Sequence, residues 1–196
     1  MTRFSQRYRL TGSTEANSVN KWFGGGFVQY YPEPTNSYFP IASYTVPSGG
    51  VSSITFGGLP QTFTHLQIRG MYAQSVSNYT GIRFNGDTGN NYTIHVLQGN
   101  GSAASAAVYT SRSDTAIADS SSTSFGSFIT DILDYANLTK YKTQRTLYGV
   151  DSNGGGAILF TSGLWQNTTA INSITFTATS GASFSQYSNI SIYGVN

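Results

Sequence analysis

The sequence predicts an all-β fold, an antiparallel jelly-roll-like β-sandwich preceded by an irregular, extended N-terminal arm. Apolar residues alternate with Ser, Thr or Asn over most of the chain, as in Ile171-Asn-Ser-Ile-Thr-Phe-Thr177. Such alternation places one side chain on the core face of a sheet and the next on its outer face. The chain has 22 Gly, 14 Tyr and 12 Phe among 196 residues, which favours strands, turns and aromatic packing. No segment has the period of a long amphipathic helix, although residues 133–142 have room for one helical turn.

Residues 1–40 are the predicted arm, and residues 41–196 are the predicted sandwich domain. The arm contains Gly24-Gly25-Gly26 and Tyr30-Tyr31-Pro32-Glu33-Pro34, and glycines and prolines at this density disfavour regular structure. We expect the arm to dock on a neighbouring subunit through basic and aromatic side chains. The expected anchoring residues are Arg3, Arg7, Arg9, Trp22, Phe23, Tyr30 and Tyr31.

Twelve strands are predicted in the domain, each a run of alternating or β-favouring residues between turn signals. In chain order they are residues 41–46, 51–56, 63–74, 80–85, 92–98, 105–111, 114–119, 125–135, 144–150, 157–163, 171–178 and 187–195. The turn signals include Pro47-Ser48-Gly49-Gly50, Asn85-Gly86-Asp87 and Asn153-Gly154-Gly155-Gly156, where Gly and Asn tolerate positive φ angles. Strands this short and this closely spaced are typical of a two-layer sandwich.

Two of these strands contain the same four residues. Ser53-Ile-Thr-Phe56 lies near the start of the domain, and Ser173-Ile-Thr-Phe176 lies near its end. We interpret the match as shared strand chemistry, because two short copies do not establish a repeat. The outer faces of such strands carry uncharged hydroxyls and amides, which suits a contact surface.

Charge is scarce and unevenly placed. Asp, Glu, Lys and Arg make up 9% of the residues and the net charge is +2, whereas about a quarter of residues are charged in an average protein. Four cations and one anion fall in residues 1–21, too few to favour nucleic acid over an acidic protein surface. The chain has no Cys, no apolar run of membrane-spanning length and no signal-like apolar segment. We expect no cofactor, no membrane span and no nucleic-acid partner.

Few side chains are available for acid, base or nucleophilic chemistry. The chain has eight Asp and Glu and two His, without a Gly-x-Ser-x-Gly or His-Glu-x-x-His motif. Asp131 and Asp134 are three residues apart, which places them on opposite faces of a strand and excludes a carboxylate pair. We expect them to cap a turn or to meet Lys140, Lys142 or Arg145, and we predict that the protein is not an enzyme.

The two histidines and one glycine motif have structural interpretations. His65 and His95 lie in strand patterns without a second His or a carboxylate at ligand spacing, so we predict hydrogen-bonded structural roles. Residues Gly99-Asn-Gly-Ser-Ala-Ala104 fit the pattern of a dinucleotide-binding loop, with Asp119 twenty residues later. That fingerprint requires a following helix and a parallel βαβ unit, so a hairpin loop is the prediction here.

Oxygen-bearing side chains gather in Asn85-Gly-Asp-Thr-Gly-Asn-Asn91. Asn85 and Asp87 are the candidates for a weak cation site, and a plain turn is the alternative. The segment lacks the closing Glu of a calcium loop, because position 96 is Val. With one carboxylate in reach, we favour the turn and predict no metal site.

Aromatic residues give the strongest argument for binding, because Tyr and Trp combine a large contact area with a polar end. We expect the core to take most of them. Trp165, Tyr79, Tyr92 and Tyr109 lie near predicted loops. These four are the candidates for a surface platform that binds a glycan.

Five segments of the domain resemble, in order, a module of the structural and fibre proteins of tailed bacteriophages, especially aquatic ones. They are Phe63–Arg69, Ile82–Tyr92, Phe125–Tyr135, Ser162–Trp165 and Ile190–Gly194. The resemblance covers roughly residues 41–196 and leaves residues 1–40 outside the module. It implies a β-sandwich on the surface of a virion, and it transfers no catalytic residue.

The resemblance leads to two expectations about function. The first is a capsid decoration or cement protein that assembles in the host cytoplasm, forms a homo-oligomer and contacts major capsid or tail proteins. A short arm before the domain favours this compact attachment over a tail fibre with a long shaft. The alternative is a short tail fibre or a receptor-binding protein that recognises a host carbohydrate.

Overall fold

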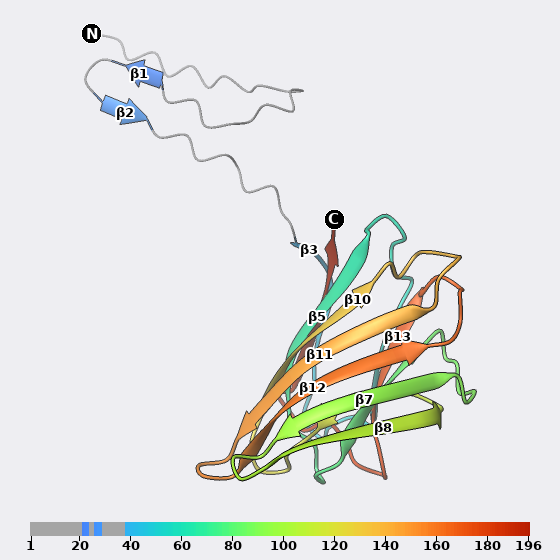
Figure 1. Ribbon diagram of the computed structural model, residues 1–196. Coiled ribbons are helices and arrows are strands. Elements are labelled where there is room, and N and C mark those ends of the chain that lie inside the picture. The colour runs from blue at the N-terminus through green and yellow to red at the C-terminus, as the bar shows by residue number, and fades with distance from the viewer. Residues whose placement is uncertain (1–20, 24–25, 29–37) are drawn as a thin grey trace. The chain divides into compact units, whose positions relative to one another are not determined.

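The computed structural model describes residues 21–23, 26–28 and 38–196, and the chain divides into two compact units, Met1–Ser37 and Tyr38–Asn196 (Figure 1). In the first unit, β1 (Lys21–Phe23) pairs antiparallel with β2 (Gly26–Val28). The prediction of an irregular arm is therefore wrong over these residues. Strand-favouring aromatic residues and a Val flank two glycines there, a sequence typical of a hairpin.

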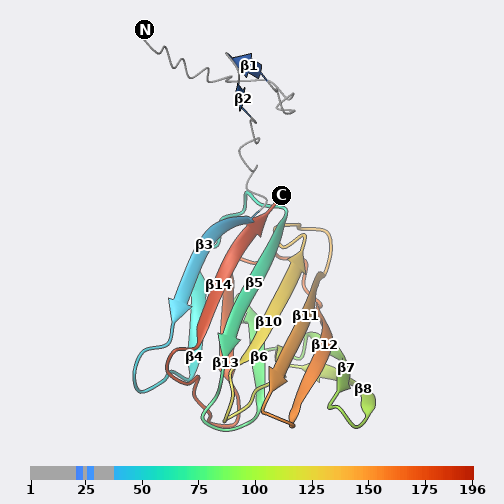
Figure 2. The same cartoon turned by 90° about the vertical axis from the view of Figure 1, so that its left-hand side faces the viewer.

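The second unit consists of two antiparallel sheets packed as a sandwich (Figures 1 and 2). The larger sheet contains, in spatial order, β3 (Tyr38–Thr45), β14 (Asn189–Val195), β5 (His65–Tyr72), β10 (Gly126–Leu133), β11 (Lys142–Asp151), β12 (Gly156–Trp165), β7 (Tyr92–Gly99) and β8 (Ala104–Arg112). The smaller sheet contains β4 (Ser53–Gly57), β13 (Ser173–Ala178), β6 (Tyr79–Phe84) and β9 (Thr115–Asp119). The predicted sandwich is confirmed, and so are all twelve predicted strands, whose ends are placed within three residues.

The core lies between the two sheets and follows the predicted alternation in β13. Ile174 and Phe176 are fully buried, while Thr175 faces outward and its hydroxyl lies 3.0 Å from the hydroxyl of Thr55 on β4. The rings of Phe176 and Phe56 meet edge to face, with their centroids 6.1 Å apart. Apolar burial and aromatic contacts of this kind provide most of the stability of a sandwich.

Beneath the middle of β10, β11 and β12 lies a group of polar side chains, between core residues of the same strands such as Phe128, Tyr148 and Leu159. Thr130, Gln144, Thr146 and Thr161 are all buried. The hydroxyls of Thr130 and Thr146 lie 2.7 Å apart, and Gln144 Nε2 donates to Thr146 Oγ1 at 2.8 Å. Buried polar groups of this kind are tolerated when they are hydrogen-bonded to one another or to the backbone.

The position of β9 explains this polar interior. β9 is the last strand of the smaller sheet, and it contacts β11 and β12 of the larger sheet. Gln144 Nε2 donates to the carbonyl oxygen of Ala116 at 2.9 Å, and Thr161 Oγ1 donates to that of Ile117 at 3.1 Å. A buried carbonyl without a partner costs stability, so these two side chains of the larger sheet supply hydrogen bonds that stabilise β9.

No helix in the described ranges, residues 21–23, 26–28 and 38–196, is both long enough and apolar enough to cross a membrane.

Candidate functional site

The outer face of the larger sheet is the candidate functional surface, and it has two halves of different chemistry. The polar half lies over β3, β14 and β5 (Figure 2). Its centre carries hydroxyl, amide and guanidinium groups, because the cross-strand register places Ser191 between Ser43 and Arg69, while Tyr38 and Met71 are exposed nearby. The expected outer face of uncharged hydroxyls and amides is largely found in this half.

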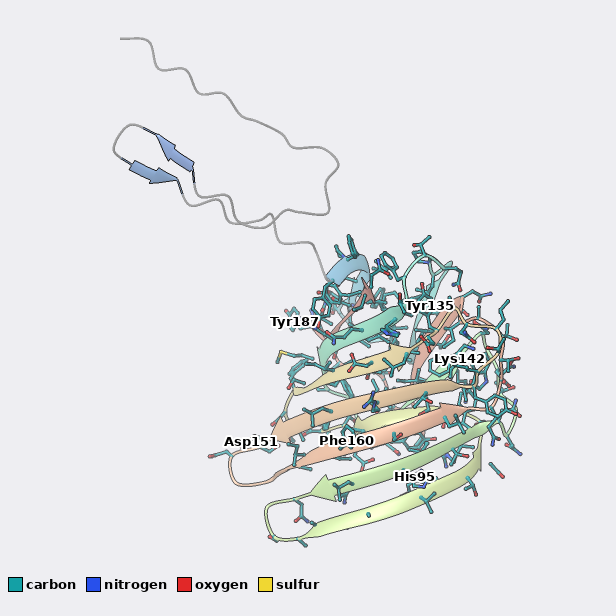
Figure 3. The ribbon with its side chains drawn as sticks, turned by 45° about the horizontal axis from the view of Figure 1, so that its top comes forward. His95, Tyr135, Lys142, Asp151, Phe160 and Tyr187 are labelled. Carbon is teal, nitrogen blue, oxygen red and sulfur yellow. The ribbon has the colours of Figure 1, made fainter. Side chains whose placement is uncertain are left out.

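The apolar half lies over β10, β11, β12, β7 and β8. Across these five strands one register position holds, in order, Ile129, Leu147, Phe160, Leu97 and Ala106. We call these residues the apolar row. Its four large side chains are between 43% and 55% exposed. Figure 3 shows Phe160 on this face, with His95 on the neighbouring strand.

The alternation of β10, β11 and β12 is inverted locally at the apolar row, whereas Phe128, Tyr148 and Leu159 of the same strands keep the usual inward position. On β11 the polar Gln144 and Thr146 face the core, so Leu147 faces outward. On β12 the polar Thr161 faces the core, so Phe160 faces outward. Gln144 and Thr161 face inward and bond to β9, and since successive side chains of a strand point to opposite faces, Leu147 and Phe160 face outward.

The surroundings of the apolar row carry almost no net charge. Asp131 lies directly opposite Arg145 in the neighbouring register position, and its carboxylate accepts a hydrogen bond from Gln67 at 2.8 Å. A groove of about 510 Å³ follows β7, β8 and β12, and its lining includes His95, Val108 and, from the row itself, Leu97, Ala106 and Phe160. His95 is exposed there and has no hydrogen-bond partner among the described residues, so the prediction of a hydrogen-bonded role is wrong for His95.

A second hollow lies on the polar half, with a volume of about 540 Å³. Its lining includes Arg69, Met71, Phe125, Tyr187 and Asn189. Tyr187 is 73% exposed and has a positive φ of 72°, a conformation that costs free energy for a residue with a large side chain. Figure 3 shows Tyr187 well away from Phe160.

Arg69 is held in place within that hollow. Its guanidinium carbon lies 4.7 Å from the ring centroid of Tyr38 and 5.6 Å from that of Tyr193. Its Nε donates to Gln67 Oε1 at 2.5 Å. Cation–π contacts with two rings fix the guanidinium plane and leave its other donors at the surface.

Two of the four predicted platform residues are buried, and for Trp165 and Tyr92 the prediction of a surface platform is wrong. Their exposed fractions are 1% and 0%, and their rings stack with centroids 6.3 Å apart. Trp165 Nε1 donates to Asp87 Oδ2 at 2.8 Å, and the Tyr92 hydroxyl accepts from the Phe84 amide at 3.1 Å. Both polar ends are therefore engaged inside the fold, and neither ring offers a free face.

The other two, Tyr79 and Tyr109, lie on either side of Arg112. The Arg112 guanidinium carbon is 5.1 Å from the centroid of Tyr79 and 6.0 Å from that of Tyr109. Arg112 Nη2 donates to the Tyr79 hydroxyl at 2.6 Å. The buried carboxylate of Asp114 forms ion pairs with Arg112 at 3.4 Å and with Arg83 at 3.8 Å. Tyr109 is about half exposed, so only this candidate presents a large free surface.

The candidate cation site adopts the geometry of a turn. Asp87 accepts hydrogen bonds from Trp165, from Asn91 Nδ2 at 2.9 Å and from the Gly89 amide at 2.8 Å. Asn85 Oδ1 accepts from the amides of Asn172 and Ser173 at 2.8 and 3.1 Å. Within residues 38–196, no three His, Cys, Asp or Glu side chains are grouped closely enough to hold a metal ion. These oxygens join the loop between β6 and β7 to the end of β12 and to the connection between β12 and β13.

Asp131 and Asp134 lie apart, as their spacing predicts. Asp134 follows β10 and accepts a hydrogen bond from Lys140 Nζ at 2.8 Å, which lowers the pKa of its carboxyl. The Asp134 amide donates to His65 Nδ1 at 3.0 Å, so the hydrogen-bonded role predicted for His65 is confirmed.

Lys142 is buried and donates to the carbonyls of Asn137, Lys140 and Thr168. Both lysines hold the β10–β11 connection.

The glycine motif at residues 99–104 is the loop between β7 and β8, as predicted. Asn100 Oδ1 accepts from the amides of Ser102 and Ala103 at 3.0 and 2.9 Å. The predicted anchoring residues Arg3, Arg7, Arg9, Tyr30 and Tyr31 lie outside the described residues, and Trp22 and Phe23 fall in β1.

No protein family, curated protein or solved structure matches this chain.

Proposed function

We propose that this protein is a structural component of a tailed-phage virion, a capsid decoration or cement protein without enzymatic activity. The observation that carries the proposal is the apolar row on the outer face of the larger sheet. The resemblance of five sequence segments to a phage structural module supplies the setting. The proposed partners are major capsid or tail proteins and further copies of this chain.

The chemistry of the row suits a permanent protein contact. Ile129, Leu147, Phe160 and Leu97 are each about half exposed and lie side by side on four neighbouring strands. Soluble monomers rarely expose contiguous apolar patches larger than a few hundred Å². Covering such a patch removes apolar surface from water at about 25 cal/mol per Å². Because few charges surround the row, little ion desolvation opposes the contact.

The close groups of ionisable residues in the sandwich have partners that fit structural roles. Asp87 holds Trp165, Asp114 holds Arg83 and Arg112, and Asp134 holds Lys140. These carboxylates are engaged in hydrogen bonds or ion pairs with groups of the fold itself. We therefore assign the outer surface, and not a group of titratable residues, as the functional feature.

The decisive experiment compares a charge placed on the two halves of the outer face. Phage particles are assembled with the wild-type protein, with Leu147→Lys or with Ser43→Lys, which is exposed on the polar half. We expect Leu147→Lys to reduce incorporation at least about tenfold, because a buried unpaired charge opposes the contact, while Ser43→Lys incorporates normally. Particles that lack the protein should release their genome at a lower temperature.

Equal incorporation of both variants, with normal folding by circular dichroism, would contradict the role of the row. Particles that keep their heat stability but fail to adsorb to cells would contradict the cement role and favour receptor binding.

The arm is tested separately. Deletion of residues 1–37, which leaves β3 intact, should abolish incorporation if the arm is the proposed anchor. The matched control is a chain of full length in which residues 1–37 are replaced by a Gly/Ser linker of equal length, which should fail equally. Normal incorporation of either chain would refute the anchor.

A second candidate function, recognition of a host carbohydrate, is favoured by the hollow on the polar half. Arg69, Asn189 and Tyr187 combine hydrogen-bonding groups with an exposed ring around a volume of about 540 Å³, which is the general composition of a ligand site. Binding of the full chain to a glycan array, lost in Tyr187→Ala and retained in Tyr109→Ala, would support it. Loss in Tyr109→Ala alone would place the glycan at Arg112 instead.

A further inference from the structure

The outermost strand of the larger sheet, β8, has an unusual combination of length and exposure. Its nine residues, Ala104–Arg112, form one edge of the sheet, and all but the last are exposed. It is paired in continuous register from Ala104 to Tyr109 with β7. In Figure 1 it lies at the lower margin of the sheet, next to β7. Both of its faces and one row of backbone groups are therefore open to a partner.

Natural proteins usually protect such an edge. Proline, bulges, inward-pointing charges or lysines along the strand interrupt the pairing of another strand. β3, at the opposite edge of the same sheet, contains Pro40, and its pairing with β14 shifts between Ile192 and Tyr193. β8 contains no proline, and its only charged residue, Arg112, lies at its end. β8 is irregular only near its end, where its pairing with β7 shifts between Tyr92 and Ile94 and Ser111 has a positive φ of 54°. The two edges therefore differ over residues 104–109, a stretch of β8 that has no proline, no bulge and no charge.

We propose that β8 is an assembly edge, and that it pairs antiparallel with β8 of a second copy of this chain about a twofold axis. The two eight-stranded sheets then form one continuous sheet, with main-chain hydrogen bonds between the copies. The axis lies at Ala107. This register places Ala106 opposite Val108 of the partner subunit, so that the apolar rows of the two copies join on the same outer face.

The charge distribution favours a second copy in this orientation. Antiparallel pairing places the two Arg112 side chains at opposite ends of the interface, roughly 34 Å apart for ten residues at about 3.4 Å each. That distance exceeds the Debye length of about 8 Å at physiological ionic strength. Parallel pairing would place like charges side by side and would lose stability. A small, uncharged centre formed by Ala106, Ala107 and Val108 offers no steric or electrostatic obstacle to the contact.

A cysteine series on the full-length chain tests the register directly, because the protein has no Cys of its own. We expect Ala107→Cys to form a disulfide-linked dimer under mild oxidation, since a residue on the axis faces its own copy within disulfide range. Ala104→Cys should not form one, because its counterpart lies at the far end of the interface. Ser43→Cys on β3 is the matched control at the other edge and should also stay monomeric.

A charge variant tests the energetics of the same edge. Ala107 points to the face opposite the apolar row, so Ala107→Lys places two like charges at the axis without altering the row. We expect it to raise the dissociation constant of the dimer at least about tenfold in sedimentation equilibrium, while Ser43→Lys leaves it unchanged.

Three results would overturn the proposal: a wild-type chain that remains monomeric at high micromolar concentration, equal cross-linking of Ala104→Cys and Ala107→Cys, or a dimer unaffected by Ala107→Lys. These measurements are made on the isolated chain in solution, so their failure is separate from a failure of incorporation into particles.

Discussion

The two halves of the outer face belong to one hydrogen-bonded sheet, yet their polarity is opposite. On β5, Ile68 faces the core and Arg69 faces outward, which is the usual arrangement for a soluble sandwich. On β11, Thr146 faces the core and Leu147 faces outward. The layer beneath differs too, because β9 contacts β11 and β12, and Gln144 and Thr161 donate to its carbonyls. The contact surface thus lies on the strands whose inner side chains bond to the last strand of the smaller sheet.

The largest effect is expected in the half with the usual arrangement. Ile68 is fully buried, and Ile68→Ala removes buried methyl groups and leaves a cavity. We expect the free energy of unfolding, measured by urea denaturation, to fall by about 2–5 kcal/mol. Ser127→Ala, at an exposed outward position of β10, is the control and should change it by less than about 0.5 kcal/mol. Similar values for the two variants would mean that this half is not the apolar core.

The next largest loss of stability is expected among the buried polar residues beneath the apolar half. Thr130→Val or Thr146→Val each leaves a buried hydroxyl without the 2.7 Å contact between them, and each should cost about 1–3 kcal/mol. The double variant should cost less than the sum of the two, with a coupling of about 1 kcal/mol in a double-mutant cycle. Strict additivity would show that the two hydroxyls do not stabilise each other and would weaken the account of a polar interior.

Substitutions in the apolar row should barely alter stability. Leu147→Thr and Phe160→Thr replace half-exposed side chains, so each should change the free energy of unfolding by less than about 0.5 kcal/mol. Binding of the apolar dye ANS should decrease in both, and remain unchanged in Ser43→Ala on the polar half. A large loss of stability would mean that Leu147 and Phe160 serve the fold and not a partner.

Local sequence was sufficient to predict the strands but not the direction of every side chain. In β13, Ile174 and Phe176 alternate with Thr175, and the alternation alone indicates which side chains are buried. In β11, Thr146, Leu147 and Tyr148 follow one another, so the pattern does not determine which residue of the first two faces inward. Gln144, which faces the same way as Thr146, donates to the carbonyl of Ala116 in β9. That carbonyl lies about thirty residues away in the chain and is brought close only by the fold.

The same limit explains the aromatic candidates. Trp165 ends a strand beside a polar segment, which resembles a surface position in sequence. Its burial depends on Asp87, which accepts the indole hydrogen bond, and on stacking with Tyr92. Neither partner is near Trp165 in the chain, so no local signal distinguishes a core tryptophan from a platform.

Asp87 gives the smallest predicted effect, and its dependence on pH can be assigned a sign. Burial raises the pKa of the Asp87 carboxyl, but hydrogen bonds from Asn91, Trp165 and Gly89 outweigh it and hold the pKa below its ordinary value. A lower pKa in the folded state means that the carboxylate stabilises the fold above the pKa of the unfolded chain, and that this contribution is lost as pH falls through the folded-state value.

We therefore expect the melting temperature of the wild type to decline below about pH 4. In Asp87→Asn, which keeps an oxygen acceptor for the Trp165 indole but cannot titrate, the decline should be smaller. Asp151→Asn, in the exposed end of β11 (Figure 3), is the matched control. Asp87 joins Trp165 of the apolar half to the loop after β6. An identical decline in wild type and Asp87→Asn would mean that the charge of Asp87 does not stabilise this contact. Hydrogen bonding and packing alone would then hold Trp165 in place.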